Sequence, residues 1–254
     1  MEVLRKSSVA TNEAGQVSET DHTLVAPVVP SLDNEDSFSL QSLGHHKLLP
    51  AGQTILHESA SMTSVAEILS GIVKLTKTLS DGRQQIVGLR FASDFLGCPF
   101  KATSPYNAEA VTNVHLCLYD RMKFEQGLKD NRVIEHRLYQ NTLDELDEAR
   151  EWMLLLGRKY AGEKIASFLL MVALRTQNSP DGDQLSSPLT FTLPLTRTEI
   201  ADFLGLTIET VSRHISALKA KKIISLQANR VVTILDPDRL TAMAEQEYAR
   251  KALH

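Results

Sequence analysis

The pattern of apolar and polar residues changes once along the chain. Between about residues 44 and 119, apolar and polar positions alternate in short runs such as SVAEILS and RQQIVGL, with glycines between them. Alternation with a period of two is typical of strands that bury one face. After residue 121 the apolar positions recur every three or four residues, which indicates helices. The pattern predicts an α+β chain with a β domain followed by helices.

Four stretches of the β part are strand-like: HKLLPAGQTIL, SVAEILSGIVKLTKTL, RQQIVGLRF and AEAVTNVHLCLYD. Gly52, Gly71 and the pair Asp81 and Gly82 lie at the predicted turns. An Asp-Gly pair between two alternating runs is a strong signal for a hairpin.

Residues 121–156 contain no proline and one glycine, and are predicted to form one long helix after its first turn. Along it, six positions follow the 3, 4, 3, 4, 3 spacing of a coiled-coil seam: Tyr139, Thr142, Leu146, Ala149, Met153 and Leu156. No carboxylate falls on this seam, so two copies could pair without burying like charges. The spacing predicts a homodimer. The alternative is a helix packed on its own sheet through Leu138, Leu143 and Leu154; both contacts can coexist.

Residues 196–224 predict two short amphipathic helices joined by a tight turn. Thr196 and Glu199 have the spacing of a capping box at the start of the first helix. Gly205 supplies the left-handed conformation that the turn requires, and Thr207 is a suitable N-cap for the second helix.

The outer face of the second helix carries Ile208, Glu209, Ser212 and Arg213. The planar fork of an arginine matches guanine O6 and N7, and a glutamate one turn earlier can accept from the amino group of cytosine. Isoleucine and serine are suited to the methyl group or O4 of thymine. These residues predict base contacts in double-stranded DNA; the alternative is an ordinary solvated helix. We expect phosphate contacts from Thr196, Thr198, Thr207 and Lys219.

The run LGLTIETVSRHI closely resembles the recognition element of the Crp/Fnr superfamily of bacterial transcription regulators, and ETVSR is similar to its Fnr/FixK branch. The resemblance extends over about residues 38–243. It implies a sensory double-stranded β-roll, a dimerisation helix and a winged helix-turn-helix. In relatives, the residues matching Glu209 and Arg213 contact the G·C-containing core of each half-site, and those matching Ser212 and Ile208 favour thymine. His214 departs from the family, which usually has an apolar residue there facing the first helix.

The resemblance divides the chain into a flexible tail (1–36), a β-roll (37–122), a dimerisation helix (123–157) and a winged helix-turn-helix (158–254). A two-stranded wing is expected to turn at Ala228 and Asn229, followed by a closing helix over residues 236–253. RNA polymerase is an implied partner, with residues 80–83 and 180–184 as candidate contacts.

No cofactor is expected. Oxygen-sensing relatives hold an iron–sulfur cluster with four cysteine thiolates, whereas this chain has only Cys98 and Cys117. Both are candidate redox thiols, although Cys117 fits a buried strand position and Cys98 a loop.

The stretches SDFLGCPF and YNAEAVTNV correspond to the cyclic-nucleotide contacts of relatives, but the second has no arginine to balance a phosphate. His45 and His46 point to opposite faces of a strand, which disfavours haem. The alternative remains a regulator whose β-roll must bind a small ligand or haem first.

The charge of the whole chain does not indicate a DNA-binding protein, but the charge of its C-terminal part does. The net charge is −4, but residues 197–230 carry six Lys or Arg against three acidic residues, a basic module on an acidic body. No apolar run is long enough for a membrane span and the cysteines are few, which predicts a cytoplasmic protein. No motif of a catalytic site is present, so an enzyme is not expected.

Overall fold

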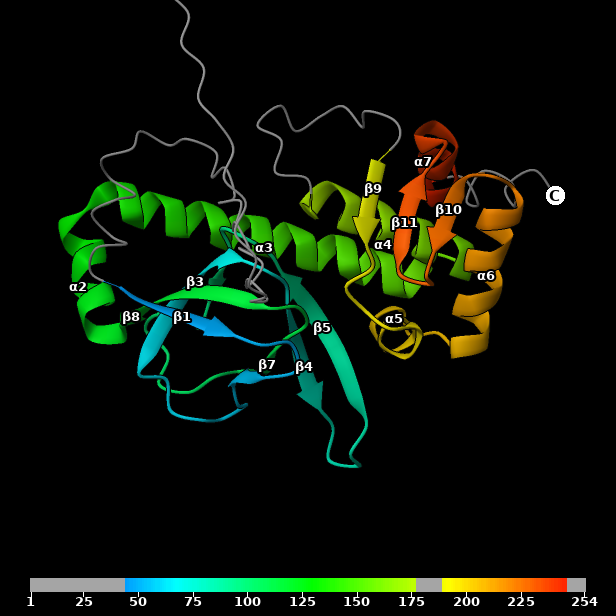
Figure 1. Cartoon of the computed structure of the whole chain (residues 1–254). Helices are drawn as coiled ribbons and strands as arrows, with labels where there is room; N and C mark the ends of the chain where they lie inside the picture. Colours follow the sequence, from blue (N-terminus) through cyan, green and yellow to red (C-terminus); the bar gives the residue numbers. More distant parts are fainter. Residues whose placement is uncertain (1–43, 177–188, 246–254) are drawn as a thin grey trace, which may run out of the picture.

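The computed structural model describes residues 44–176 and 189–245 (Figure 1). A β-roll is joined by one long helix, which runs along it, to a C-terminal unit of helices and a small sheet (Figure 1). The predicted tail over residues 1–36 and the candidate polymerase contact at 180–184 lie outside the described residues.

The β-roll consists of two four-stranded antiparallel sheets with the orders β1-β8-β3-β6 and β2-β7-β4-β5. Apolar side chains that alternate along the strands, among them Ile68, Leu75 and Leu116, form the core of the roll. The strands are β1 (His45–Leu49), β2 (Thr54–Leu56), β3 (Ser64–Ser70), β4 (Val73–Thr78), β5 (Gln84–Arg90), β6 (Phe95–Leu96), β7 (Asn107–Ala110) and β8 (Val114–Asp120). The predicted roll is confirmed.

The predicted turns also form. Gly82 has φ +86° in the hairpin between β4 and β5. Gly71 joins β3 to β4 with φ +93°, and a Cβ there would overlap the backbone carbonyl of Asn113. Position 71 requires both a positive φ and the absence of a Cβ, and only glycine meets both requirements.

The prediction of one helix over residues 121–156 is wrong. The chain forms α2 (Arg121–Asp130) and α3 (Arg132–Arg158), with Asn131 between them in an extended conformation, φ −128° and ψ 103°. The Asn131 side-chain oxygen accepts hydrogen bonds from Val133 N at 2.9 Å and Ile134 N at 3.3 Å. Asparagine competes for backbone groups in this way, so it ends one helix and caps the next.

The C-terminal unit contains α4 (Ala161–Thr176), β9 (Leu189–Thr192), α5 (Arg197–Leu204), α6 (Ile208–Ala220), β10 (Ile224–Gln227), β11 (Val231–Ile234) and α7 (Pro237–Glu245). The wing turns at Ala228 and Asn229, both with positive φ, as predicted. An unpredicted third strand, β9, pairs with β11. The described part of the closing helix is α7; residues 246–253 lie outside the described range.

One apolar core connects the β-roll to the C-terminal unit. Leu89 and Phe91, at the end of β5 and just after it, belong to the same buried cluster as Phe168 of α4 and Phe203 of α5. Because packed cores transmit displacements, the orientation of α5 depends on the β-roll.

Candidate nucleic-acid interface

The helix-turn-helix begins at the predicted capping box. Thr196 Oγ1 accepts from Glu199 N at 3.2 Å, and Glu199 Oε2 accepts from Thr196 N at 2.9 Å. The Thr196 hydroxyl also donates to Glu199 Oε2 at 2.8 Å. A phosphate contact from this hydroxyl would therefore require it to leave Glu199. Thr198, the next predicted phosphate contact, is exposed on the first turn of α5.

The turn between α5 and α6 has the predicted form. Gly205 is left-handed, with φ 62° and ψ 44°, and Thr207 Oγ1 accepts from Thr210 N at 3.3 Å. The buried ammonium group of Lys164, on α4, donates to Leu204 O at 3.1 Å. This contact satisfies a carbonyl at the end of α5 and fixes α5 on α4.

Helix α6 has one buried face and one exposed face. Val211, Ile215 and Leu218 are buried. The predicted base contacts are all exposed on the other side: Ile208, Glu209, Ser212 and Arg213. Hydrogen bonds from its own backbone N–H and from Thr207 lower the pKa of Glu209. Glu209 is therefore an ionised acceptor at neutral pH, the form that suits a cytosine amino group.

A groove of about 380 Å³ separates α6 from the wing. It is lined by Arg197, Ser212, Ser216, Lys219 and Asn229 among others. Arg197 Nη1 is buried and has no hydrogen-bond partner among the described residues, and burial lowers the pKa of Arg197. The sequence identified Arg197 only as part of a basic region, yet its guanidinium lies in the same groove as Lys219 and Ser212.

His214, on α6, lies against the start of α4. A Cβ placed on Gly162 of α4 would lie 3.4 Å from His214 Nδ1, so the imidazole packs on the bare backbone at the start of α4. The departure from the usual apolar residue is accommodated because position 162 has no side chain.

The β-roll contacts both ends of α5. Lys74 Nζ, on β4, lies 2.7 Å from Glu199 Oε1 and 2.9 Å from Glu109 Oε1. Gln85 Nε2, on β5, donates to Asp202 O at 2.6 Å. Burial alone would lower the pKa of Lys74, but the two carboxylates raise it above its ordinary value. We refer to these contacts of Lys74 and Gln85 with α5 as the β4–β5 clamp.

The predicted seam of α3 is uncovered in the single chain. Tyr139, Thr142, Leu146, Ala149 and Met153 are exposed, Met153 to 67%, and Leu156 is half-buried. Other positions of α3 contact the same chain: Trp152 stacks on Phe203 with ring centroids 4.1 Å apart, and Arg137 bonds to Glu67 at 2.6 Å.

The alternative buried face of α3 is largely wrong. Leu138 packs half-buried against the β-roll, but Leu143 and Leu154 are exposed. Helix α3 continues to Arg158, two residues beyond the predicted end at residue 156, and α4 starts at Ala161.

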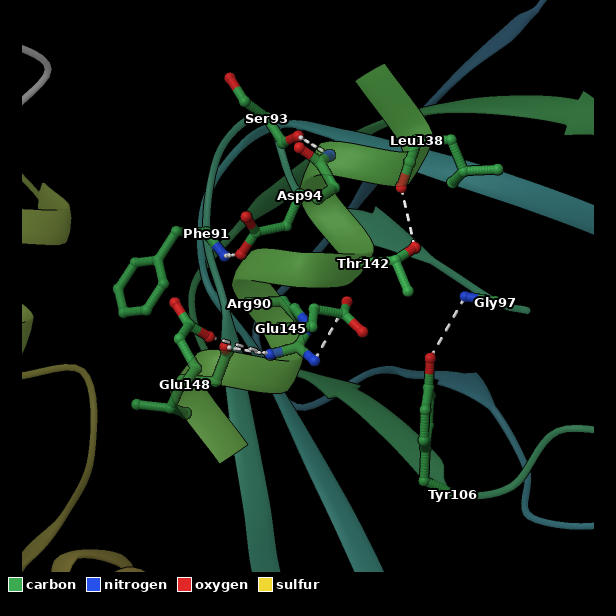
Figure 2. Close-up of polar contacts among 12 residues, drawn as sticks. Arg90, Phe91, Ser93, Asp94, Gly97, Tyr106, Leu138, Thr142, Glu145 and Glu148 are labelled. Atoms are coloured by element: carbon green, nitrogen blue, oxygen red, sulfur yellow. Dashed lines mark hydrogen bonds and ion pairs between the residues drawn. The ribbon is translucent and has the colours of Figure 1, made fainter. Parts of the chain in front are cut away.

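The cyclic-nucleotide position of the β-roll holds a tyrosine. Gly97 N donates to Tyr106 Oη at 3.3 Å, and burial raises the pKa of Tyr106 to about 12 (Figure 2). Gly97 belongs to the first of the two stretches compared with cyclic-nucleotide contacts and Tyr106 to the second. The nearby Arg90 is held by Glu145 at 3.1 Å (Figure 2).

The two cysteines differ in their exposure to solvent. Burial raises the pKa of Cys117 on β8, and Gly44 lies directly over its sulfur with no room for a Cβ. Cys98 is half-buried after β6. A redox role for either thiol stays a prediction.

His46 Nδ1 lies 3.0 Å from His115 Nε2, so the two imidazoles contact each other on the surface of the β-roll.

None of the helices within residues 44–176 and 189–245 is long and apolar enough to cross a membrane.

Comparison with known proteins accounts for both parts of the structure. Residues 163–243 match the Crp-like helix-turn-helix domain, and residues 46–131 match the cyclic nucleotide-binding domain. The chain is 45% identical to the transcriptional activator protein FnrL of Cereibacter sphaeroides, covering 82% of this chain and 84% of FnrL. It is 34% identical to the nitrogen fixation regulation protein FixK of Bradyrhizobium diazoefficiens, covering 85% and 89% of the two chains.

The structure of FixK2 from Bradyrhizobium japonicum is similar over 79% of this chain and 96% of that chain, with a TM-score of 0.69 and 30% identity. These relatives are regulators rather than enzymes. The chain therefore belongs to the Crp/Fnr family, in its FixK-like branch, and is a transcriptional activator with a helix-turn-helix DNA-binding domain.

Proposed function

We propose that the protein acts as a homodimer on the inverted repeat TTGA, about six bases, TCAA, and that it binds this site without a small effector. The observation that carries the proposal is the outer face of α6. Two pairs of residues one turn apart, Ile208 with Ser212 and Glu209 with Arg213, are exposed there, while the opposite face is buried.

The chemistry of this face fits the proposed half-site. Arg213 donates to guanine O6 and N7, and the ionised Glu209 accepts from a cytosine amino group. Ile208 and Ser212 contact thymine, where a long cationic side chain would favour guanine. Thr198, Thr207 and Lys219 contact phosphates, and Arg197 joins them from the groove beside the wing.

A two-fold dimer accounts for the repeat. The exposed seam of α3 pairs with the same seam of a second copy, which places two α6 helices about one turn of DNA apart. The tail (1–36), β-roll (37–122), dimerisation helix (123–157) and winged helix-turn-helix (158–254) are the proposed functional divisions. The exposed tip of the β4–β5 hairpin, at residues 80–83, is a proposed contact for RNA polymerase.

Effector independence is supported by the Tyr106 hydroxyl, which accepts the Gly97 N–H at the nucleotide position of the roll. A cyclic phosphate placed there would have to displace this half-buried side chain and would meet no arginine from the stretch YNAEAVTNV.

Fluorescence anisotropy tests the proposal. Purified protein in air, without added ligand, is titrated into a labelled TTGA/TCAA duplex and a duplex with TGTGA-type half-sites, both at one fixed salt concentration. We expect tight binding to the first duplex alone. Weak binding to both would support the effector-gated alternative, and preference for the second would contradict the roles of Ile208 and Ser212.

A further inference from the structure

His46 and His115 form a pair of histidines on the surface of the β-roll, on two neighbouring strands. In the antiparallel register of β1 and β8, His46 lies opposite Cys117 and His115 lies opposite Leu48. The two imidazoles are therefore diagonal neighbours on one face of the sheet. His46 is exposed and His115 is half-buried, so the pair lies at the surface.

The backbone holds both histidines in a fixed relationship. β8 is hydrogen-bonded to strands on both of its sides, β1 on one and β3 on the other. The ladder fixes the positions of the two Cα atoms, so only side-chain rotations remain to be ordered when a ligand binds. A pair of ligating side chains on such a framework is more precise than a pair on loops.

The separation of the two ring nitrogens matches two adjacent positions around one metal ion. Imidazole nitrogens bind transition metals at about 2.0–2.1 Å. Two nitrogens bound at right angles, as in tetragonal Cu²⁺ and Ni²⁺ sites, are about 2.9 Å apart, whereas a tetrahedral angle separates them by about 3.3 Å. His46 Nδ1 and His115 Nε2 are 3.0 Å apart, with ring planes tilted by 46°. The distance is closer to the first geometry.

The surroundings of the pair leave the remaining coordination positions to water. Within residues 44–176 and 189–245, no group of three or more His, Cys, Asp or Glu side chains could hold a metal ion. Cys117 lies opposite His46, but Gly44 covers its sulfur. Two imidazoles without a carboxylate disfavour Mg²⁺ and Ca²⁺, which prefer oxygen ligands. Among the metals that imidazole suits, Cu²⁺ has the highest affinity.

We propose that His46 and His115 form a chelating site for Cu²⁺, which binds Ni²⁺ and Zn²⁺ more weakly. Rotation of the exposed His46 ring aims both lone pairs at one ion, and the proton shared by the two nitrogens is released to water. The ion links the edge strand β1 to β8 and so stabilises the β-roll. The site lies on the β-roll, far from α6, and does not depend on the proposed DNA sequence (Figure 1).

Electron paramagnetic resonance of the full-length protein with added copper chloride tests the site. We expect one bound Cu²⁺ per chain whose spectrum shows hyperfine coupling to the nitrogens of two imidazoles. The thermal unfolding midpoint should rise with copper, and calorimetry should give tighter binding for Cu²⁺ than for Ni²⁺ or Zn²⁺. A spectrum without two imidazole nitrogens, or tighter binding of Zn²⁺ than of Cu²⁺, would overturn the proposal.

Single substitutions assign the site, because the chain has eight histidines. His46→Gln and His115→Gln each leave one imidazole, so the two-nitrogen spectrum should disappear and the affinity for Cu²⁺ should fall about 100-fold as chelation is lost. His45→Gln is the matched control, because His45 is exposed on the same strand but points to the opposite face. Circular dichroism checks folding, which His46→Gln on an exposed edge strand should not disturb.

The variants also distinguish a metal site from a simple hydrogen bond between two imidazoles. If both His46→Gln and His115→Gln bind Cu²⁺ as tightly as the wild type, the pair is only a hydrogen bond and the proposal is wrong. Loss of the two-nitrogen spectrum in His45→Gln would likewise overturn it, because the copper would then be held elsewhere.

Discussion

Lys74 Nζ lies 2.7 Å from Glu199 Oε1, so a strand of the β-roll is bonded to the carboxylate that caps the first helix of the helix-turn-helix. The same ammonium group lies 2.9 Å from Glu109, and its side chain is only 13% exposed. A charge pair with little access to water is screened weakly. The position of α5, and through the Gly205 turn that of α6, is therefore set partly by β4.

Replacing Lys74 by methionine should destabilise the folded chain. It leaves Glu109 and Glu199 facing each other without their cation, which should cost about 1–3 kcal/mol of unfolding free energy, measured by urea denaturation. Specific DNA binding should also weaken, because α5 loses its contact with β4.

Lys77→Met provides the control for this change. Lys77, on the same strand, pairs with Glu58 at 2.9 Å, but its side chain is 49% exposed, and pairs of this kind contribute about 0–1 kcal/mol. Equal losses in the two variants would contradict the importance of the β4–β5 clamp.

The carboxylate of Glu199, which caps α5, should make the stability of the folded chain depend on pH. Burial alone would raise the pKa of Glu199, but Lys74 and the hydrogen bonds of Thr196 lower it below its ordinary value. Glu199 thus contributes stability that is present above about pH 4.3, its unfolded pKa, and is lost as the pH falls through the lower folded pKa.

A comparison of the wild type with Glu199→Gln tests whether the pKa of Glu199 is lowered in the folded state. The difference in unfolding free energy should be constant near neutral pH and shrink below about pH 4. A difference that grows on acidification would mean that the folded-state pKa of Glu199 is raised rather than lowered.

The sequence predicted elements whose determinants are local. Thr196, Glu199 and Gly205 lie within ten residues of each other, and their capping box and left-handed turn form as expected. The break at Asn131 was missed because asparagine occurs both inside helices and at caps, and its neighbours are all compatible with a helix. Strand β9 and the pairing of Lys74 with Glu199 could not be predicted either, because both depend on residues distant in the sequence.

The proposed dimer predicts the effect of a charge on the seam. Met153→Glu should dissociate the dimer at micromolar concentration, because the two-fold axis would bring two carboxylates together in an apolar interface. Sedimentation measures this directly. Glu151→Gln, on the opposite side of the heptad, should leave the assembly unchanged. If Met153→Glu sediments like the wild type, α3 does not pair through the proposed seam.

Substitutions of Arg213 and Lys219 should distinguish base contacts from phosphate contacts on α6. Arg213→Ala should cost about 1–3 kcal/mol per half-site and relax the preference at the guanine, because the bidentate contact is lost. Lys219→Ala should instead weaken binding to all sequences alike and reduce the salt dependence by about one ion per half-site, since a phosphate contact carries no sequence information. Both side chains are exposed, so neither change should affect folding. Anisotropy titrations on the TTGA/TCAA duplex and on one substituted at the guanine, each at several salt concentrations, separate the two effects. If Arg213→Ala retained wild-type discrimination at the guanine, the base contact would belong to another residue, and the orientation of α6 in the groove would have to be reassigned.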